Sequence, residues 1–448
     1  MNNLFSKLHL RHILIIAAVI AVVIAGVSAA FLLHKQPAPQ SKNAANETTA
    51  IVNARIFDGE RIIDDHVVVI KGAVIHAIGG TIPEDAAVID AKGATLLPGF
   101  IDSHVHTDMD GLRDALVFGV TTELEMMGTW SAKKRMEIAG RDDIADLRSP
   151  GMAITTKGGH PSQYIKTSDN LVIRYFFRFP YVTSPDDAVK FVDTRIAEGA
   201  DYIKIIIEDG TIVGIPGLPV ISDKTLLAAI HEAHDNNRMA IAHVSTAAGA
   251  ALAIDSGIDG LAHLFYDCAP PPELVAAIAS SGAFVVPNLV TASTAFGNNA
   301  AALAADERVR SRLSKKWLDS LCGSMNTYPD GKMEDVFTSV LELHRAGVDI
   351  LAGSDVSEPI PGLGGLAHGA SLHHELQMLV AAGLKPIEAL RAATATPARR
   401  FGLTDRGRIA PGMLADLLLV EGDPLTTISD TLSIRTVWHR GTQLIANR

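Results

Sequence analysis

The chain has 448 residues, of which 48% are hydrophobic and 20% are charged, and its formal net charge is −11 at pH 7. That length suffices for one barrel-sized domain of about 250 residues together with a smaller companion domain. The acidic balance argues against nucleic-acid binding, which needs a basic face.

A long apolar run stands near the N-terminus. Residues 13–33 carry no charged side chain and follow Lys7 and Arg11. Such a run can span a hydrocarbon core of about 30 Å as a helix. It also exceeds the apolar region of a cleavable signal, about 7 to 15 residues, although residues 27–29 offer a small-residue cleavage site. Residues 1–35 are therefore predicted to be a signal anchor or a signal peptide. The body is expected to be membrane-anchored outside the cytoplasm, or periplasmic or secreted after cleavage.

The next segments change from polar to strand-like. Residues 36–48 are polar, contain two prolines and are predicted to form a flexible linker. Residues 49–97 contain short apolar runs separated by turn signals such as Asp58-Gly59, a pattern typical of antiparallel strands. Residues 398–448 are strand-rich again. We expect these two blocks to form one small β domain.

Residues 98–397 alternate between strand-like and helical runs. The predicted strands after the first one include residues 119–126, 151–156 and 349–355. This alternation is typical of repeated βα units around a parallel sheet. The carboxyl ends of the strands in a parallel barrel meet at one mouth, where catalytic side chains gather.

Ligand-type side chains lie at or near the ends of several of these strand-like runs. His104 and His106 are two residues apart, so on a β-strand both imidazoles point to the same face. Four further runs carry a residue of this kind: Lys204, His243, His263 and Asp355. If the runs are neighbouring barrel strands, all of these side chains face one cavity, and imidazoles with a carboxylate are typical of a divalent metal site.

These motifs together resemble the metal-dependent amidohydrolase superfamily, and within it the prolidase-like and imidazolonepropionase-like branch. The resemblance extends from residue 51 onward. It is carried by LPGFIDSHVH at 97–106, GVTT at 119–122, GADYIKI at 199–205 and GRIAPGMLADLLLVEGDPL at 407–425. The fold that it implies is α/β: a distorted (β/α)8 TIM barrel with a flanking β-sandwich domain built from both chain ends.

The resemblance also implies a centre of two divalent metal ions, with Zn²⁺ favoured. Its ligands would be His104 and His106 at the more buried ion, His243 and His263 at the more exposed ion, Lys204 as a bridge and Asp355 at the buried ion. Lys204 would be carbamylated by carbon dioxide, because a free lysine is cationic near neutral pH. Asp355 would serve as the general base for a metal-bridging hydroxide.

Other positions are less closely tied to the metal centre. His160, in KGGH, and His368 are candidate substrate contacts. Cys268 and Cys322 lack metal-type spacing, and whether they pair stays open. Glu125 stands where the branch often has an aspartate, and the branch's aromatic residue is missing two positions after His243. Dipeptide specificity therefore cannot be inherited from the branch.

The favoured hypothesis is a binuclear amidohydrolase that cleaves the C–N bond of a small substrate, such as a dipeptide or an N-acyl amino acid. The alternative is a lactonase or esterase on the same metal centre. A mononuclear deaminase would not need Lys204, and a non-catalytic scaffold would normally have lost a ligand. The expected partners are a small-molecule substrate, a membrane if the N-terminal segment is retained, and a second copy of the chain if the protein is a homo-oligomer.

Overall fold

The computed structural model describes residues 47–167 and 179–444. The predicted signal segment, residues 1–35, and nearly all of the predicted linker lie outside the described residues. The first strand begins at Thr48, so it includes the last residue assigned to the linker. Within the described ranges, no helix is both long enough and apolar enough to cross a membrane.

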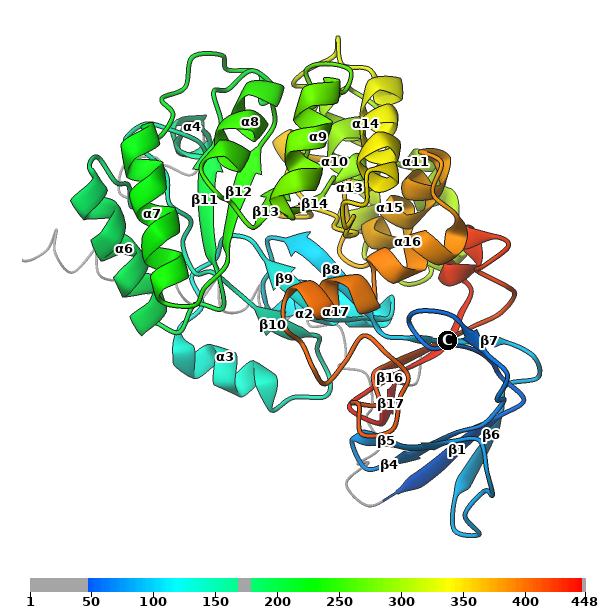
Figure 1. Ribbon diagram of the computed structural model, residues 1–448. Coiled ribbons are helices and arrows are strands. Elements are labelled where there is room, and N and C mark those ends of the chain that lie inside the picture. Colours follow the sequence, from blue (N-terminus) through cyan, green and yellow to red (C-terminus); the bar gives the residue numbers. More distant parts are fainter. Residues whose placement is uncertain (1–46, 168–178, 445–448) are drawn as a thin grey trace, which may run out of the picture. The chain divides into compact units, whose positions relative to one another are not determined.

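Two sheets are built from the N-terminal and C-terminal parts of the described chain (Figure 1). One sheet has the order β5 (Val74–Ile78), β4 (Val68–Lys71), β1 (Thr48–Val52) and β6 (Ala87–Asp90). The other has the order β17 (Thr442–Leu444), β16 (Ile434–His439), β15 (Leu417–Val420), β7 (Thr95–Pro98), β2 (Arg55–Phe57) and β3 (Ile62–Ile63). Ile51, Leu96 and Trp438 belong to one buried hydrophobic cluster. Residues from both chain ends thus share a core.

Parallel strands form the central part of the chain. One sheet has the order β10 (Asp146–Arg148), β9 (Val120–Glu125) and β8 (Phe100–Val105). The other has the order β11 (Ile203–Ile207), β12 (Ala240–Val244), β13 (Gly260–Ala262) and β14 (Phe284–Val286). All pairings inside these two sheets are parallel. The expected α/β character is confirmed.

Isolated bridges, rather than regular ladders, connect these sheets. Ile154 pairs with Ile205 of β11, and residues 350 and 356 pair with β14 and β8 respectively. Two of the predicted strands, residues 151–156 and 349–355, therefore contribute only isolated bridges, because their backbones pair over too few residues to form a ladder. Closure into an eight-stranded barrel stays a prediction.

Helices follow most of the parallel strands (Figure 1). They are α2 (Met109–Val117), α3 (Ala132–Ala139), α4 (Ser162–Thr167), α6 (Pro185–Ala197), α7 (Asp223–Asp235), α8 (Ala247–Asp255), α9 (Pro272–Ser281), α10 (Leu289–Ala295), α11 (Ala301–Ala305), α12 (Glu307–Arg310), α13 (Lys315–Leu321), α14 (Met333–Arg345), α15 (Ala370–Ala381), α16 (Pro386–Ala392) and α17 (Ala395–Arg400), with the 3-10 helices η1 (Pro361–Leu363) and η2 (Ile428–Leu432).

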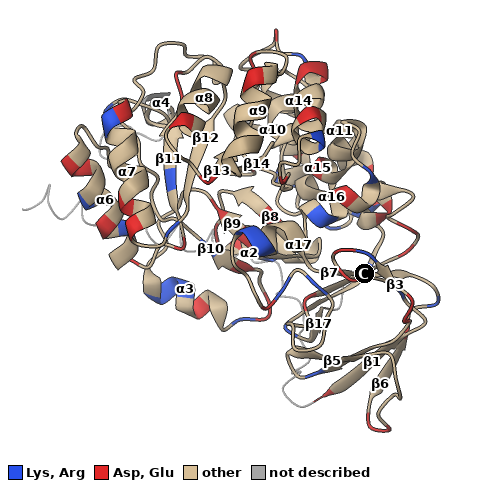
Figure 2. Cartoon of the chain, in the orientation of Figure 1, with Lys and Arg blue, Asp and Glu red and all other residues tan. Residues whose placement is uncertain are grey.

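The helix starts are encoded locally. Ser184, Ser222 and Thr246 each accept a hydrogen bond from a backbone N–H of the first turn of α6, α7 and α8, which is the usual role of a capping hydroxyl. Figure 2 shows that Lys, Arg, Asp and Glu lie mainly on helices and loops, whereas most of the strand segments are uncharged. The parallel strands nevertheless carry six charged side chains, and Lys204 in β11 is the only lysine among them; the others are Asp102, Glu123, Glu125, Asp146 and Arg148.

Candidate metal centre

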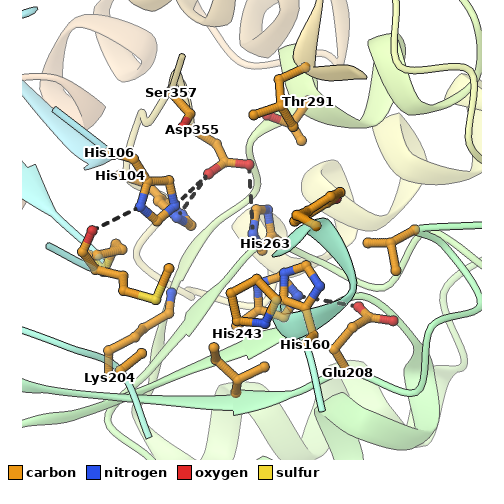
Figure 3. A pocket seen from close by; sticks show the side chains of 18 of the residues that line it. His104, His106, His160, Lys204, Glu208, His243, His263, Thr291, Asp355 and Ser357 are labelled. Atoms are coloured by element: carbon orange, nitrogen blue, oxygen red, sulfur yellow. Dashed lines mark hydrogen bonds and ion pairs between the residues drawn. The ribbon is translucent and has the colours of Figure 1, made fainter. Parts of the chain in front are cut away.

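A cavity of about 650 Å³ lies at the carboxyl ends of the parallel strands. Its lining includes all of the predicted ligands and one of the two predicted substrate contacts: His104, His106, Lys204, His243, His263, Asp355 and His160. Figure 3 shows these side chains pointing toward one another in the cavity. The structure thus brings together residues that are up to 251 positions apart along the chain.

Asp355 lies at the centre of one half of this group. Its Oδ1 is 3.1 Å from Nε2 of His104 and 3.4 Å from Nε2 of His106, and its Oδ2 is 3.9 Å from Nε2 of His263. Ligand-type atoms of His104, His263 and Asp355 lie within 4.8 Å of one another. These three side chains can therefore reach a single ion.

Two of these residues have a left-handed backbone conformation, and their side chains line the cavity. His263 follows β13 directly and has φ +71°, and Asp355 has φ +52°. Left-handed backbone is uncommon for residues other than glycine and costs about 1–2 kcal/mol. The amide of Asp355 donates a 2.6 Å hydrogen bond to the carbonyl of His104, which holds one of these turns in place. Such strain persists where the surrounding structure enforces it, and it concentrates at functional sites.

Hydrogen bonds set the orientation of the first two imidazoles. Nδ1 of His104 lies 3.1 Å from Oδ1 of Asn288, and Nδ1 of His106 lies 3.2 Å from the carbonyl of Met127. Because a carbonyl oxygen only accepts, each Nδ1 carries the proton and each Nε2 is left with a lone pair. Both lone pairs face Oδ1 of Asp355, an arrangement that needs a shared proton or a metal ion between them.

The protonation states also suit metal ligands. Burial lowers the pKa of His104 to about 3. Burial alone would raise the pKa of Asp355, but its electrostatic and hydrogen-bond interactions with the surrounding imidazoles of His104, His106 and His263 hold it well below its usual value. Neutral imidazoles beside an ionised carboxylate are the forms that bind a divalent cation.

Lys204 lies in the same cavity in an unusual state. Its Nζ is buried and has no hydrogen-bond partner among the residues that the structure describes. Burial lowers the pKa of Lys204 to about 7, so the neutral amine is well populated near neutral pH. An uncompensated buried ammonium is costly, so this environment favours the neutral, nucleophilic amine.

His243 faces a different partner. Its Nε2 lies 3.2 Å from Oε2 of Glu208, and its ring stacks on that of His160 with centroids 4.9 Å apart. Gln163 Nε2 lies 2.7 Å from Nδ1 of His160. The His243 ring also meets His263 edge-on at 4.5 Å. The two predicted ligands of the more exposed ion are therefore neighbours.

Two residues of the site were missing from the predicted set. Glu208 follows β11 and is four residues after Lys204, so the alternation of a strand places both on one face. Asn288 lies two residues beyond the end of β14. Both residues lie just after the end of a strand, as the predicted ligands His106 and His263 do. Glutamate and asparagine are common at such positions, however, so neither residue type identifies a site alone.

Glu125, which stands where the resembled branch often has an aspartate, holds a neighbouring side chain of the cavity wall in place. Oε1 of Glu125 accepts a 2.8 Å hydrogen bond from Trp130, and Oε2 accepts one of 2.6 Å from Ser149. Burial raises the pKa of Glu125 to about 7. The carboxyl group anchors Trp130, which lines the cavity.

The second predicted substrate contact lies elsewhere. His368 is not among the residues that line the cavity. It is buried, with Nδ1 3.3 Å from Oε1 of Glu123 and its ring edge-on to Trp317. The two cysteines do not pair: Cys268 is half-buried, Cys322 is exposed and both are free.

Known sequences and structures resemble most of the described chain. The pattern of the Amidohydrolase family matches residues 95–444, and that of the NagA composite domain matches residues 49–96. An imidazolonepropionase from Cereibacter sphaeroides is 24% identical over 406 residues, covering 83% of this chain and 92% of that protein. An adenine deaminase from Methanoregula boonei is 43% identical over 68 residues, but this match spans only 12% of the deaminase and 15% of this chain.

Solved structures agree on the fold. A crystal structure described as an amidohydrolase has a TM-score of 0.66 at 25% identity, covering 89% of this chain and 99% of that one. A structure of a Xaa-Pro dipeptidase with bound methionine has a TM-score of 0.67 at 22% identity, with the same coverage. The predicted membership of the amidohydrolase family is confirmed, and the chain is similar to an imidazolonepropionase and to a Xaa-Pro dipeptidase over most of its length.

Proposed function

Because the chain belongs to the amidohydrolase family, we propose that it is a metal-dependent hydrolase that cleaves the C–N bond of a small amide bound in the cavity. The convergence of four imidazoles, Lys204 and Asp355 on that cavity carries the proposal. His104 and His106 lie in or directly after β8, Lys204 and His243 lie in β11 and β12, and His263 follows β13, so distant segments of the chain supply this one site.

The side chains fit a centre of two divalent ions. Two ligands of one tetrahedral zinc ion lie roughly 3.3 Å apart, given bonds of about 2.0–2.1 Å. The distances from Oδ1 of Asp355 to His104 and His106 are 3.1 and 3.4 Å. His104, His106 and Asp355 would hold one ion, and His243 and His263 the other, with Zn²⁺ the first choice for this donor set.

Lys204 would supply the bridge between the ions. Its neutral amine attacks carbon dioxide, an N–C bond forms, and one N–H proton is released to solvent. The product is a carbamate, which carries a negative charge on two oxygens in place of a buried ammonium. The buried Nζ without a hydrogen-bond partner supports this assignment.

Asp355 would act as the general base. The ions, when bound, would lower the pKa of a water molecule and polarise the substrate carbonyl. The ionised carboxylate of Asp355 accepts a proton as the water oxygen forms its bond to the carbonyl carbon, and then donates that proton to the leaving nitrogen as the C–N bond breaks. Asn288 and Met127 keep the rings of His104 and His106 oriented throughout.

The rest of the cavity wall favours an apolar substrate. Large apolar side chains dominate it away from the ligands: Met126, Trp130, Met152, Phe179, Met325, Leu363 and Leu366. Apolar walls with a few convergent polar groups are typical of small-molecule sites. A substrate with a bulky apolar group next to its amide, such as an N-acyl amino acid with an apolar side chain or a dipeptide of such residues, suits this lining.

We also infer that the parallel strands close into a barrel beside a β-sandwich. The isolated bridges of residues 350 and 356 with β14 and β8 connect the two parallel sheets at one gap, and the bridge of Ile154 with β11 extends the second sheet toward the other gap. The hydrophobic cluster shared by the two outer sheets supports the sandwich.

Elemental analysis of the full chain, purified without chelator, is the direct test of the centre. We expect about two divalent ions per chain and an intact mass, under non-denaturing conditions, that includes one added carbon dioxide. One ion without the added mass would contradict the binuclear centre. Initial rates on dipeptides, N-acyl amino acids and lactones then test the bond: hydrolysis of lactones alone would overturn cleavage of a C–N bond in favour of an ester-type reaction.

A further inference from the structure

Glu208 is a buried carboxylate at the metal centre that the expected ligand set does not include. It follows β11 directly and lines the cavity. Its side chain is 0% exposed, and the contacting side chain of His243 is 13% exposed. An ionised carboxyl group is expensive to bury unless hydrogen bonds compensate it. The partners of its two oxygens therefore indicate its role.

Three groups contact these oxygens. The backbone N–H of Gly210 donates to Oε1 at 2.6 Å. The hydroxyl of Ser245 donates a short hydrogen bond to Oε2, and Nε2 of His243 lies 3.2 Å from the same oxygen. An ionised carboxylate only accepts hydrogen bonds. Nε2 of His243 must then carry the proton, and Nδ1 of that ring is left with the lone pair.

This tautomer is the reverse of the one found in the other half of the site. His104 and His106 carry their protons on Nδ1, so their Nε2 atoms are the free ligand atoms. Metal-bound histidines usually donate their second ring N–H to a carboxylate or carbonyl, which fixes the ring and makes it more basic. Asn288 and Met127 do this for His104 and His106, and Glu208 is in the matching position for His243.

The surroundings limit the alternatives for Glu208. Both of its oxygens already accept hydrogen bonds, from Gly210 at Oε1 and from Ser245 and His243 at Oε2, so turning the carboxylate toward an ion would break these bonds. The His160 ring lies nearly parallel to that of His243, at an interplanar angle of 23°, and restricts rotation of the imidazole. The ring of His243 is therefore held from one edge and one face.

We propose that Glu208 is a positioning residue for the second metal ion. It fixes the Nε2–H tautomer of His243 and so presents Nδ1 as the ligand atom, with Ser245 and Gly210 holding the carboxylate in place. This role rests on the proposed two-ion centre, and it concerns a residue that does not itself contact the ion.

The first test reads the tautomer without any metal or substrate. Long-range ¹H–¹⁵N spectra of the metal-free full chain distinguish the two neutral tautomers, and the signals of His243 are identified by their loss in His243→Asn. We expect Nε2–H in the wild type and a shift toward Nδ1–H in Glu208→Gln, in which an amide nitrogen replaces one acceptor oxygen. An Nδ1–H tautomer in the wild type would overturn the proposal.

The second test measures stepwise Zn²⁺ affinity with a competing chelator in the presence of bicarbonate. Glu208→Gln should bind the second ion about 10- to 100-fold more weakly, with the first ion bound as in the wild type. Asp209→Asn is the matched control: it removes a neighbouring negative charge, and an Asn oxygen can still accept from Thr211 as Asp209 does. It should leave both affinities unchanged.

The outcomes separate the two proposals. A wild-type chain that binds no second ion would overturn the two-ion centre, and the role of Glu208 with it. Two ions in the wild type with an unaltered second affinity in Glu208→Gln would overturn the role of Glu208 alone. The unchanged first affinity shows that the variant is folded. In Ser245→Ala, which removes one support of the carboxylate, we expect a smaller loss in the same direction. A Co²⁺ absorption spectrum showing fewer ligands in Glu208→Gln would identify Glu208 as a direct ligand and overturn the positioning role.

Discussion

The ammonium form of Lys204 is unfavourable where this residue lies. Its Nζ is buried without a hydrogen-bond partner among the described residues, and burial lowers its pKa to about 7. Only the neutral amine reacts with carbon dioxide. Carbamylation of the metal-free chain should therefore become faster as the pH rises through about 7, because protonation blocks the amine below that value.

Replacing Lys204 should remove the ligand that bridges the two proposed ions. In Lys204→Ala we expect the metal content to fall from about two ions per chain, because the anionic bridge is lost. Short carboxylic acids should restore part of the metal content by placing a carboxylate in the vacated space. Elemental analysis with and without added acetate measures both effects. Full metal occupancy in the variant without any added acid would rule out the carbamate bridge.

Asp355 is predicted to move the proton during hydrolysis. In Asp355→Asn we expect turnover to fall by about 10²- to 10⁴-fold, because an amide cannot accept the proton from water. The hydrogen bond from the backbone of Asp355 to His104 is unaffected by the change, so the fold should persist. The turnover number on an identified substrate is the measurement, with far-UV circular dichroism as the control for folding. Near-wild-type turnover would exclude Asp355 as the base.

The N-terminal end of helix α10 is capped by a side chain from another helix, α15. Asn288 precedes α10 in a left-handed conformation, and its side chain makes no cap hydrogen bond. The carboxylate of Glu375, from α15, instead accepts from the backbone N–H groups of Leu289 and Val290 at 2.9 Å each. The Asn288 side chain is thereby released to accept from His104 and from the backbone N–H of His263.

Removing the Asn288 amide should weaken the first metal site. We expect Asn288→Ala and Asn288→Gly to bind the first ion about 10- to 100-fold more weakly, because the His104 ring loses its acceptor. Glycine accepts a left-handed backbone, whereas alanine is strained there by about 1 kcal/mol. Chelator competition measures the affinity and urea unfolding measures the stability. An affinity loss in the alanine variant alone would assign the effect to the backbone and not to the hydrogen bond.

Glu375 also makes the stability of this helix pair depend on pH. Burial raises the pKa of Glu375 to about 8 in the folded chain, above its value of about 4.3 in an unfolded chain. The folded state therefore binds the proton more tightly, and the stabilisation that this provides is lost as the pH rises from about 4 to about 8. In Glu375→Gln we expect the unfolding midpoint to fall less over this range. Parallel pH profiles for the variant and the wild type would disprove the assignment.

Across the whole described chain, a buried ionic network joins the C-terminal segment to the parallel strands. Asp146 in β10 forms ion pairs with Arg406 and, at 2.8 Å, with Arg440, and Arg406 also donates to Thr122 in β9 at 2.9 Å. Asp146 and Arg406 are almost fully buried. The network links residues that are 260 to 294 positions apart.

Breaking this network should be costly because it removes the buried partner of Arg406 and leaves this buried guanidinium with the half-exposed carboxylate of Asp405 alone. We expect Asp146→Asn to lower the free energy of unfolding by about 3–5 kcal/mol, measured from urea denaturation midpoints. Asp319→Asn, which breaks the exposed pair with Lys315, should change it little. If the loss comes from the buried charge of Arg406, adding Arg406→Met to Asp146→Asn should recover part of it. A double variant that is less stable than the single one would contradict this explanation.

Local sequence patterns were sufficient to predict the family, the α/β character and most of the residues that converge on the cavity. These features depend on local patterns: alternation along a strand, turn signals between strands, and ligand-type residues such as His104 and His263 at or just past the end of a strand-like run. Where the local pattern was weak, the prediction was less accurate. Residues 151–156 and 349–355 were expected to be regular strands, but they pair only through isolated bridges.

Long-range packing, in contrast, sets which side chains orient the candidate ligands and which predicted contact does not line the cavity. His104 meets Asn288 across 184 positions and His243 meets Glu208 across 35, whereas His368 is buried against Glu123 away from the cavity. Such contacts depend on the register and twist of neighbouring strands and on how helices pack on them. No local period in the sequence encodes these distances, so the orientation of each imidazole emerges only when distant segments come together.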